Sequence, residues 1–249
     1  MTAWIKVNNV SIDIPIYCPD RSFRSALVSK YIGGNINTSK KLIAVEALRN
    51  INFNLQEGDR LGLIGHNGAG KSTLLNTLAG IYKPISGTIQ HSGRITPLFH
   101  TSPGMDPVDS GISNIYTIGM FFGVSRKQIT AKLEEIIEFT QLQDFIHLPV
   151  RTYSTGMVAR LSFAIATCLE PDILLVDEGI GAGDESFARK AKDSLDNLYK
   201  KVKIVILASH SRELIKKLCN KAILLEHGSV VACDDIDKVF EIYDAANNA

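Results

Sequence analysis

The sequence is poor in the features that mark secreted, membrane-spanning or nucleic-acid-binding chains. Its four cysteines, Cys18, Cys168, Cys219 and Cys233, lie far apart among 249 residues and form no C-x-x-C pair. This spacing argues against a disulfide framework and against a zinc site, and it indicates reduced thiols in a cytosolic protein. Lys and Arg number 27 against 26 Asp and Glu, and the resulting formal net charge of +1 is too small to attract the whole chain to nucleic acid or to an anionic membrane.

Long apolar runs are also missing. Met1 to Val10 alternates polar and apolar residues and shows no basic stretch followed by an apolar one, so no signal peptide is visible. Runs such as Ile173 to Val176 are far too short to cross a membrane. The 45% of hydrophobic residues nevertheless suffice for a sizeable core, and we expect one soluble domain over residues 1–249.

Two stretches near the N-terminus, Trp4 to Ile14 and Leu48 to Leu55, alternate polar and apolar residues and predict two strands of an antiparallel layer. Between them lies an insertion of about residues 18–41, which is basic and ends in turn-forming residues. Its apolar residues at a spacing of four, Phe23, Leu27 and Tyr31, are compatible with a short amphipathic helix. Such a helix could lie on a lipid surface or a membrane partner, or pack on its own domain.

Strand and helix alternate in two parts of the chain. A strand, a Gly-rich turn and a helix follow one another from Arg60 to Ala79, and short apolar strands return after residue 170, which predicts a mostly parallel sheet. Between these two parts, the segment from Gly111 to Leu169 shows no strand pattern, and its apolar residues recur at the spacing of a helix. We therefore expect an α/β fold with a core of residues 1–99 and 170–249 and an inserted helical subdomain of about residues 100–169.

Residues 65–72 match the phosphate-loop pattern G-x-x-x-x-G-K-S/T and stand between an apolar strand and a helix, as that pattern requires. Glycines let backbone N–H groups turn toward phosphate oxygens, and the positive end of the following helix adds to the attraction. Lys71 then reaches the terminal phosphates of ATP, and Ser72 coordinates Mg²⁺. The nine residues predicted to bind the nucleotide are Gly65, His66, Asn67, Gly68, Ala69, Gly70, Lys71, Ser72 and Thr73.

Two further apolar strands end in polar residues. Ile173 to Val176 runs directly into Asp177, which suits Mg²⁺ and its water shell, and Glu178, which suits orienting and deprotonating the attacking water. Acids at a strand end are weak evidence alone, but phosphoryl transfer needs a metal holder and a water positioner. Ile204 to Ala208 is followed by His210. A lone histidine there is usually incidental, but beside the other motifs we expect it to contact the terminal phosphate.

These motifs together resemble the ABC ATPase family, and the likeness covers nearly the whole chain. Tyr153-Ser-Thr-Gly-Met157 is similar to the family signature L-S-G-G-Q, in which Ser154 and Gly156 match whereas Thr155 and Met157 depart. The resemblance implies that Ser154, Thr155 and Gly156, with the start of the following helix, bind the terminal phosphate of ATP held by an opposite subunit.

The sequence contains one phosphate loop, so a complete site of this kind requires two chains, most simply a second copy of this one with two ATP molecules between them. Gly181-Ala-Gly-Asp184 resembles the family loop that couples the two sites, with Asp184 as its acid.

Two family positions are less plain. The family usually offers a glutamine to the metal in the loop that leads into the helical subdomain, and none stands between Leu98 and Gly111. His100 is the nearest occupant, although Mg²⁺ prefers oxygen ligands. An aromatic residue near the first strand commonly stacks on adenine. Tyr17 is the candidate, with an ordinary surface tyrosine as the equal alternative.

Three features resemble the ATPase subunits of bacterial exporters of surface polysaccharide, especially O-antigen, with capsule and teichoic acid exporters as relatives. They are the divergent signature, the early Ile14-Pro-Ile-Tyr17, and the stretch from Gly104-Met-Asp-Pro107 to Gly111-Ile-Ser-Asn-Ile115. This implies an integral membrane permease dimer and its lipid-linked polysaccharide as partners, at the cytoplasmic face of the inner (plasma) membrane. The alternative class is a non-transport ABC ATPase. One that acts on DNA or the ribosome would show a long coiled coil or two fused halves, so we expect no nucleic acid partner. A catalytically dead ATP-dependent switch would lack the general base, whereas Glu178 is present in this sequence.

Overall fold

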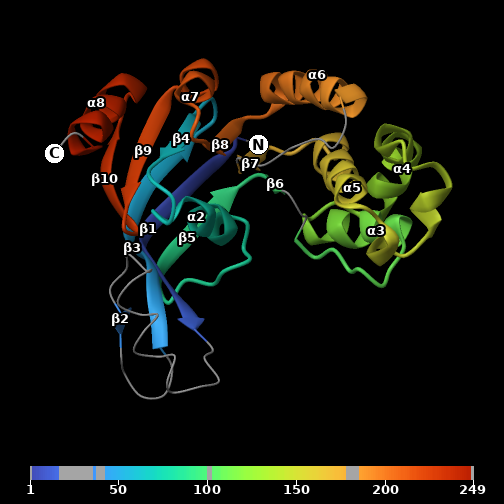
Figure 1. Cartoon of the computed structure of the whole chain (residues 1–249), viewed down its shortest axis with the longest axis horizontal. Helices are drawn as coiled ribbons and strands as arrows, with labels where there is room; N and C mark the ends of the chain where they lie inside the picture. The colour runs from blue at the N-terminus through green and yellow to red at the C-terminus, as the bar shows by residue number, and fades with distance from the viewer. Residues whose placement is uncertain (1, 17–35, 38–42, 100–102, 178–184, 248–249) are drawn as a thin grey trace. The chain divides into compact units, whose positions relative to one another are not determined.

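The computed structural model forms two compact units (Figure 1). One, here the terminal unit, consists of Thr2–Ser92 with Ile206–Ala249, and the other, here the central unit, of Gly93–Val205. Strand β8 (Ile204–Ala208), all of it buried, carries the chain from the central to the terminal unit. The structure describes residues 2–16, 36–37, 43–99, 103–177 and 185–247.

The terminal unit contains an antiparallel sheet with the strand order β2-β3-β1-β5. β1 (Trp4–Ile16) pairs along its length with β3 (Ile43–Gln56), and β5 (Ser86–Ser92) pairs with the other edge of β1. The two strands predicted from alternation are thus confirmed, and both are longer than predicted. The turn-rich end of the insertion contributes a further short strand, β2 (Ile36–Asn37), because its two residues pair with β3.

The same unit holds a mixed arrangement of strands. β4 (Arg60–Ile64) runs parallel to β9 (Lys221–Glu226), which pairs antiparallel with β10 (Ser229–Asp234). Gly62 lets a helix approach this sheet closely, since a Cβ atom there would lie 2.8 Å from the Cγ2 atom of Ile215. The helices within the described part of this unit are α2 (Lys71–Leu78), α7 (Arg212–Leu218) and α8 (Ile236–Asn247).

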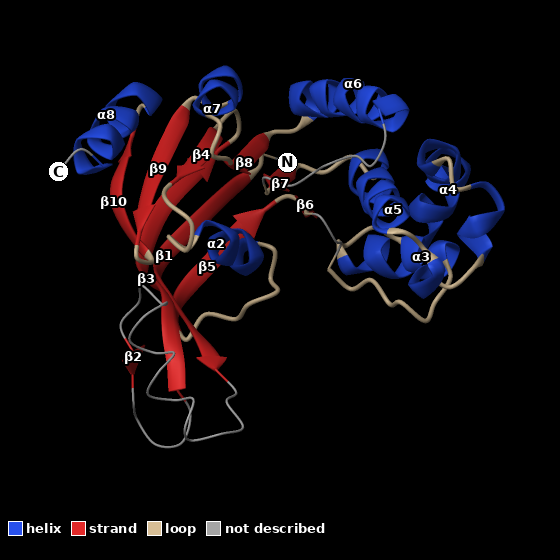
Figure 2. Ribbon diagram, viewed as in Figure 1, coloured by secondary structure: helices blue, strands red, loops and turns tan. Residues whose placement is uncertain are grey.

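The central unit combines two parallel strands with helices (Figure 2). β6 (Ile95–Leu98) pairs in register with the fully buried β7 (Ile173–Val176). The helices that the structure describes here are α3 (Gly111–Phe121), α4 (Arg126–Thr140), α5 (Thr155–Cys168) and α6 (Glu185–Lys201), together with short 3-10 helices at Gln143–His147 and Val150–Thr152.

Helices α3, α4 and α5 share one apolar core. Ile115, Ile129, Ile136 and Leu161 are fully buried in it, so the helical spacing predicted for α4 and α5 is confirmed. The α/β class with a mixed sheet and an antiparallel layer is also confirmed. None of the helices within the described ranges is both long and apolar enough to cross a membrane.

Candidate functional site

The phosphate loop follows β4, and packing dictates its two outer glycines. Gly65 has a φ of +148°, and a Cβ atom there would lie 2.3 Å from the carbonyl oxygen of Leu225 on β9. Gly70 has a φ of +109°, and its Cβ atom would lie 2.9 Å from the side chain of Leu48 on β3. Only glycine fits both positions, so the loop is pressed against two strands while His66 to Gly68 remain exposed.

The loop opens onto the start of α2. Gly70 is the N-cap residue and supplies no side-chain hydrogen bond to the first turn. The N–H groups of a first helical turn have no intrahelical acceptor, and the helix dipole adds positive potential there. Ser72 is exposed and Thr73 half-buried at this end. The arrangement is a cradle of donors suited to the phosphates of ATP.

Lys71 carries the charge of the loop. Its side chain curls back so that Nζ donates to the carbonyl oxygens of Gly65 at 2.6 Å and of His66 at 3.0 Å. The residue is only 9% exposed. An ammonium group also forms strong charge-assisted hydrogen bonds with phosphate oxygens. The loop therefore fits a triphosphate in both shape and charge.

A distant turn supports this loop. The N–H group of Gly228, between β9 and β10, donates to the carbonyl oxygen of Ala69 at 3.0 Å, and the N–H group of Arg49 on β3 donates to Gly228 at 2.8 Å. The neighbouring His227 places its ring 5.2 Å from that of His66. We did not predict this support from the sequence. Its only signal was the His-Gly pair at the end of an apolar strand.

His210 lies in the terminal unit, as the phosphate loop does. It is exposed and follows the buried Ser209 beyond the end of β8. The hydroxyl of Ser211 then caps α7 by accepting from the N–H group of Leu214 at 3.2 Å. The expected contact between His210 and the terminal phosphate stays a prediction.

Asp177 lies in the central unit, immediately after β7. It is half-buried, and its N–H group donates to the carbonyl oxygen of Leu98 at 3.4 Å. The carboxylate of Asp177 and the hydroxyl of Ser72 are oxygen ligands of the kind that Mg²⁺ prefers. The described part of the chain has no group of three or more metal-binding side chains.

The signature-like segment forms the start of α5 in the central unit. Ser154 is the N-cap, and its exposed hydroxyl accepts from the N–H group of Met157 at 3.3 Å. Thr155 is exposed and Gly156 is half-buried. Beside them lies a hollow of about 540 Å³, whose lining includes Gln141, Gln143, Phe145, Ser154, Gly156 and Arg160. The positive end of a 14-residue helix therefore faces an open space large enough for an anionic ligand.

Four further site residues were predicted from the sequence. They lie outside the described residues, and they are Tyr17, His100, Glu178 and Asp184.

Comparison with known proteins agrees with these features. The family model described as ABC transporter matches residues 48–181. The O-antigen export system ATP-binding protein RfbE of Yersinia enterocolitica is 48% identical over 89% of this chain and 94% of that protein. RfbB of Myxococcus xanthus, also an O-antigen export system ATP-binding protein, is 39% identical over 84% of this chain and 47% of that protein. The teichoic acids export ATP-binding protein TagH of Bacillus anthracis is 38% identical over 80% of this chain and 36% of that protein.

Solved structures agree in fold. An ATP-binding subunit of an ABC transporter superposes with a TM-score of 0.68 at 19% identity and covers 96% of this chain and 93% of its own. A dimeric ATP-binding cassette in a post-hydrolysis state with ADP and Pi gives a TM-score of 0.65 at 20% identity, over 93% of this chain and 98% of its own. At these identities the likeness establishes the fold alone.

Proposed function

This chain belongs to the ABC transporter family, and we propose that it is the ATP-hydrolysing subunit of a bacterial exporter of lipid-linked surface polysaccharide, namely O-antigen. The observation that carries the ATPase assignment is the phosphate loop, in which Lys71 donates to two loop carbonyls while the first turn of α2 offers its N–H groups. The observation that carries the export assignment is the identity of 48% to an O-antigen export ATP-binding protein over nearly its whole length.

Each site residue has a proposed role. Lys71 and the N–H groups of the loop bind the phosphates of ATP, and Ser72 and Asp177 would hold Mg²⁺, which neutralises phosphate charge when bound. Glu178 orients the attacking water and accepts its proton. His210 contacts the terminal phosphate, and Tyr17 stacks on adenine. His100 takes the metal-sensing position.

The second half of the site comes from a second copy of the chain. Ser154, Thr155 and Gly156 stand at the exposed positive end of α5, where they suit the terminal phosphate of ATP bound to the opposite subunit. Asp184 couples the two sites. Support comes from the sequence, which contains a single phosphate loop and a single signature.

The proposed partner is an integral membrane permease dimer that carries the glycan, with this subunit peripheral at the cytoplasmic face of the inner membrane. Closure of two ATP-loaded subunits would drive the permease. A teichoic acid or capsule exporter is the alternative, because TagH is 38% identical, although this chain spans only 36% of TagH.

Two measurements test the proposal. The purified chain should hydrolyse ATP with Mg²⁺, and Lys71→Ala should abolish hydrolysis, whereas Lys83→Ala, at an exposed position, should not. In cells that lack the gene, lipid-linked glycan should accumulate internally, and the parent chain but not Lys71→Ala should restore it to the surface. Normal surface glycan in those cells would refute the export role and leave the ATPase assignment intact.

A further inference from the structure

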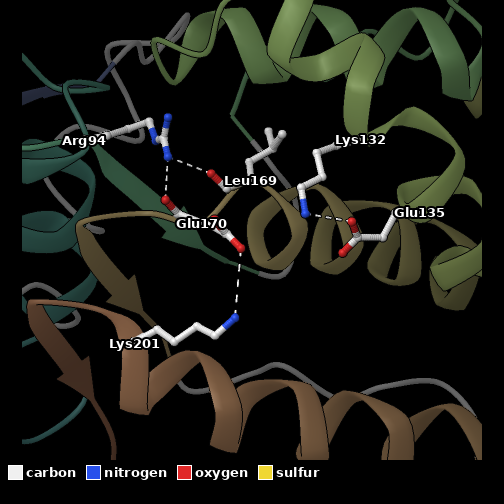
Figure 3. Close-up of polar contacts among 6 residues, drawn as sticks. All are labelled: Arg94, Lys132, Glu135, Leu169, Glu170 and Lys201. Carbon is white, nitrogen blue, oxygen red and sulfur yellow. Dashed lines mark hydrogen bonds and ion pairs between the residues drawn. The ribbon is translucent and has the colours of Figure 1, made fainter.

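The guanidinium of Arg94 holds the C-terminal end of α5, the helix that begins at Ser154 (Figure 3). Its Nη2 atom donates to the carbonyl oxygen of Leu169, the C-cap residue, at 2.7 Å, and also to that of Glu170. The last carbonyls of a helix lack intrahelical donors and carry the negative end of the helix dipole. A cation at this position therefore supplies hydrogen-bond donors to the free carbonyl groups and offsets the negative potential at the end of α5.

The chain leaves α5 in a conformation that needs such support. Glu170 has a φ of +48°, a left-handed conformation that is unfavourable for a residue with a side chain. Its own ion pair with Lys201 spans 3.9 Å between two largely exposed side chains, so it contributes little. Arg94 is thus the principal contact in Figure 3 that fixes this turn.

The backbone of Arg94 joins the same point to the strands. Its carbonyl oxygen accepts from the N–H groups of Asp172 at 3.1 Å and Ile173 at 3.0 Å, where β7 begins. Its own N–H group donates to the carboxylate of Asp172 at 2.9 Å. One residue therefore ties the end of α5 to the starts of both β6 and β7.

We propose that Arg94 is a positioning residue that acts on the ATP of the opposite subunit. A continuous helix transmits a shift at one end to the other, so release of Leu169 and Glu170 would displace Ser154 at the N-terminus of α5. This inference rests on the proposed two-chain site, in which Ser154 serves the nucleotide of the partner chain. Arg94 thus acts through its contacts with Leu169 and Glu170 and through α5.

Mixed dimers distinguish this role from an effect within the same chain. Arg94→Ala alone should lower ATPase activity by roughly tenfold to a hundredfold, because misplacement of an aligned group by about 1 Å has costs of that order. When the Arg94→Ala chain is mixed with the Lys71→Ala chain, its intact phosphate loop is paired with the normal α5 of the Lys71→Ala chain. Activity should therefore recover. When the Arg94→Ala chain is mixed with the Ser154→Arg chain, the only intact Ser154 lies on the displaced α5 of the Arg94→Ala chain. Activity should therefore stay low.

The opposite pattern would overturn the inference, since an effect through the chain's own β7 and Asp177 predicts recovery with Ser154→Arg and none with Lys71→Ala. The mixture of Lys71→Ala with Ser154→Arg is the reference for recovery. If this mixture fails to recover, the two-chain site itself is wrong, and the role of Arg94 falls with it.

Two further variants guard against trivial causes. Arg94→Lys keeps the charge but loses the planar fork of donors, so it should show the same pattern with a smaller loss, and it serves if Arg94→Ala does not fold. Arg189→Ala removes an exposed arginine from α6 of the same unit and should retain parent activity. A loss in Arg189→Ala equal to that in Arg94→Ala would show that general charge removal is the cause.

Discussion

The N–H group of Gly228 donates a 3.0 Å hydrogen bond to the carbonyl oxygen of Ala69, so a turn near the end of the chain supports the phosphate loop near its beginning. Gly228 has a φ of +77°, and a Cβ atom there would lie 2.5 Å from the carbonyl oxygen of Ala47. We expect Gly228→Ala to push the turn away from the loop, to lower ATP affinity, and to reduce the free energy of unfolding by about 1–3 kcal/mol.

A matched control separates the collision from the conformational cost. Gly58 has a similar φ of +94°, but nothing lies within 4 Å of the position of its Cβ atom. Gly58→Ala should therefore carry the cost of a left-handed alanine and leave ATP affinity unchanged. Calorimetric titration with ATP and thermal unfolding of both variants would check this. Equal ATP affinity in the two variants would show that Gly228 does not support the loop.

Local patterns in the sequence were enough to predict the strands, helices and motifs that have strong periodicity. The phosphate loop at residues 65–72 and the N-cap Ser154 stand where their patterns placed them, because each is defined by adjacent residues. β6 was missed, since it has four residues and includes Pro97, which reads as a strand breaker.

Contacts between distant segments could not be predicted. Arg94 meets Leu169 across 75 positions, and Gly228 meets Ala69 across an even longer stretch of chain. Neither residue is distinctive in its own neighbourhood, because a lone arginine before a short strand and a glycine in a hairpin are both ordinary. Only the fold brings each to its carbonyl partner.

The cysteines should differ sharply in reactivity. Burial raises the pKa of the Cys168 thiol to about 11 and that of Cys219 to about 12. The pKa of Cys233 is raised as well, but this residue is exposed to the reagent, whereas Cys168 and Cys219 are buried. The thiolate is the reactive form, and a pKa near 11 leaves only ~0.1% of it at pH 8. Among the three cysteines in the described ranges, brief treatment with iodoacetamide at pH 8 should label Cys233 first, as read from peptide masses, and urea should make Cys168 and Cys219 react as well. Equal labelling in the native protein would contradict the burial of Cys168 and Cys219.

The ion pair at the start of β7 should make stability depend on acid pH. Burial alone would raise the pKa of Asp172, but the N–H group of Arg94 and the ammonium of Lys203, 2.8 Å away, outweigh it and hold the pKa below its usual range. A lowered folded pKa gives stability that is present above the unfolded pKa of about 4 and is lost as the pH falls through the folded value.

Asp172→Asn should therefore melt below the parent at pH 7, and the gap should narrow as the pH falls below about 4. Asp237→Asn is the control, because Asp237 pairs with Lys216 at 2.6 Å on the exposed surface, where an ion pair contributes little. Melting temperatures measured from pH 3 to pH 7 in one buffer series would show the effect. A gap that is constant across this range would mean that the charge of Asp172 does not matter.

The general base can be tested by a substitution that keeps its shape. Glu178→Gln removes the basic oxygen while Lys71, Ser72 and the N–H groups of the phosphate loop are untouched. Hydrolysis should fall by roughly a hundredfold to ten-thousandfold, and ATP should still bind. With ATP and Mg²⁺, the mass of the particle in solution should then be that of a persistent dimer, because closed subunits can no longer release their nucleotide by hydrolysis.

Glu241→Gln, at an exposed position on α8, is the control and should hydrolyse ATP at the parent rate. A Glu178→Gln chain that matches the parent rate would remove this residue from the mechanism, and one that fails to bind ATP would assign it to folding or metal binding.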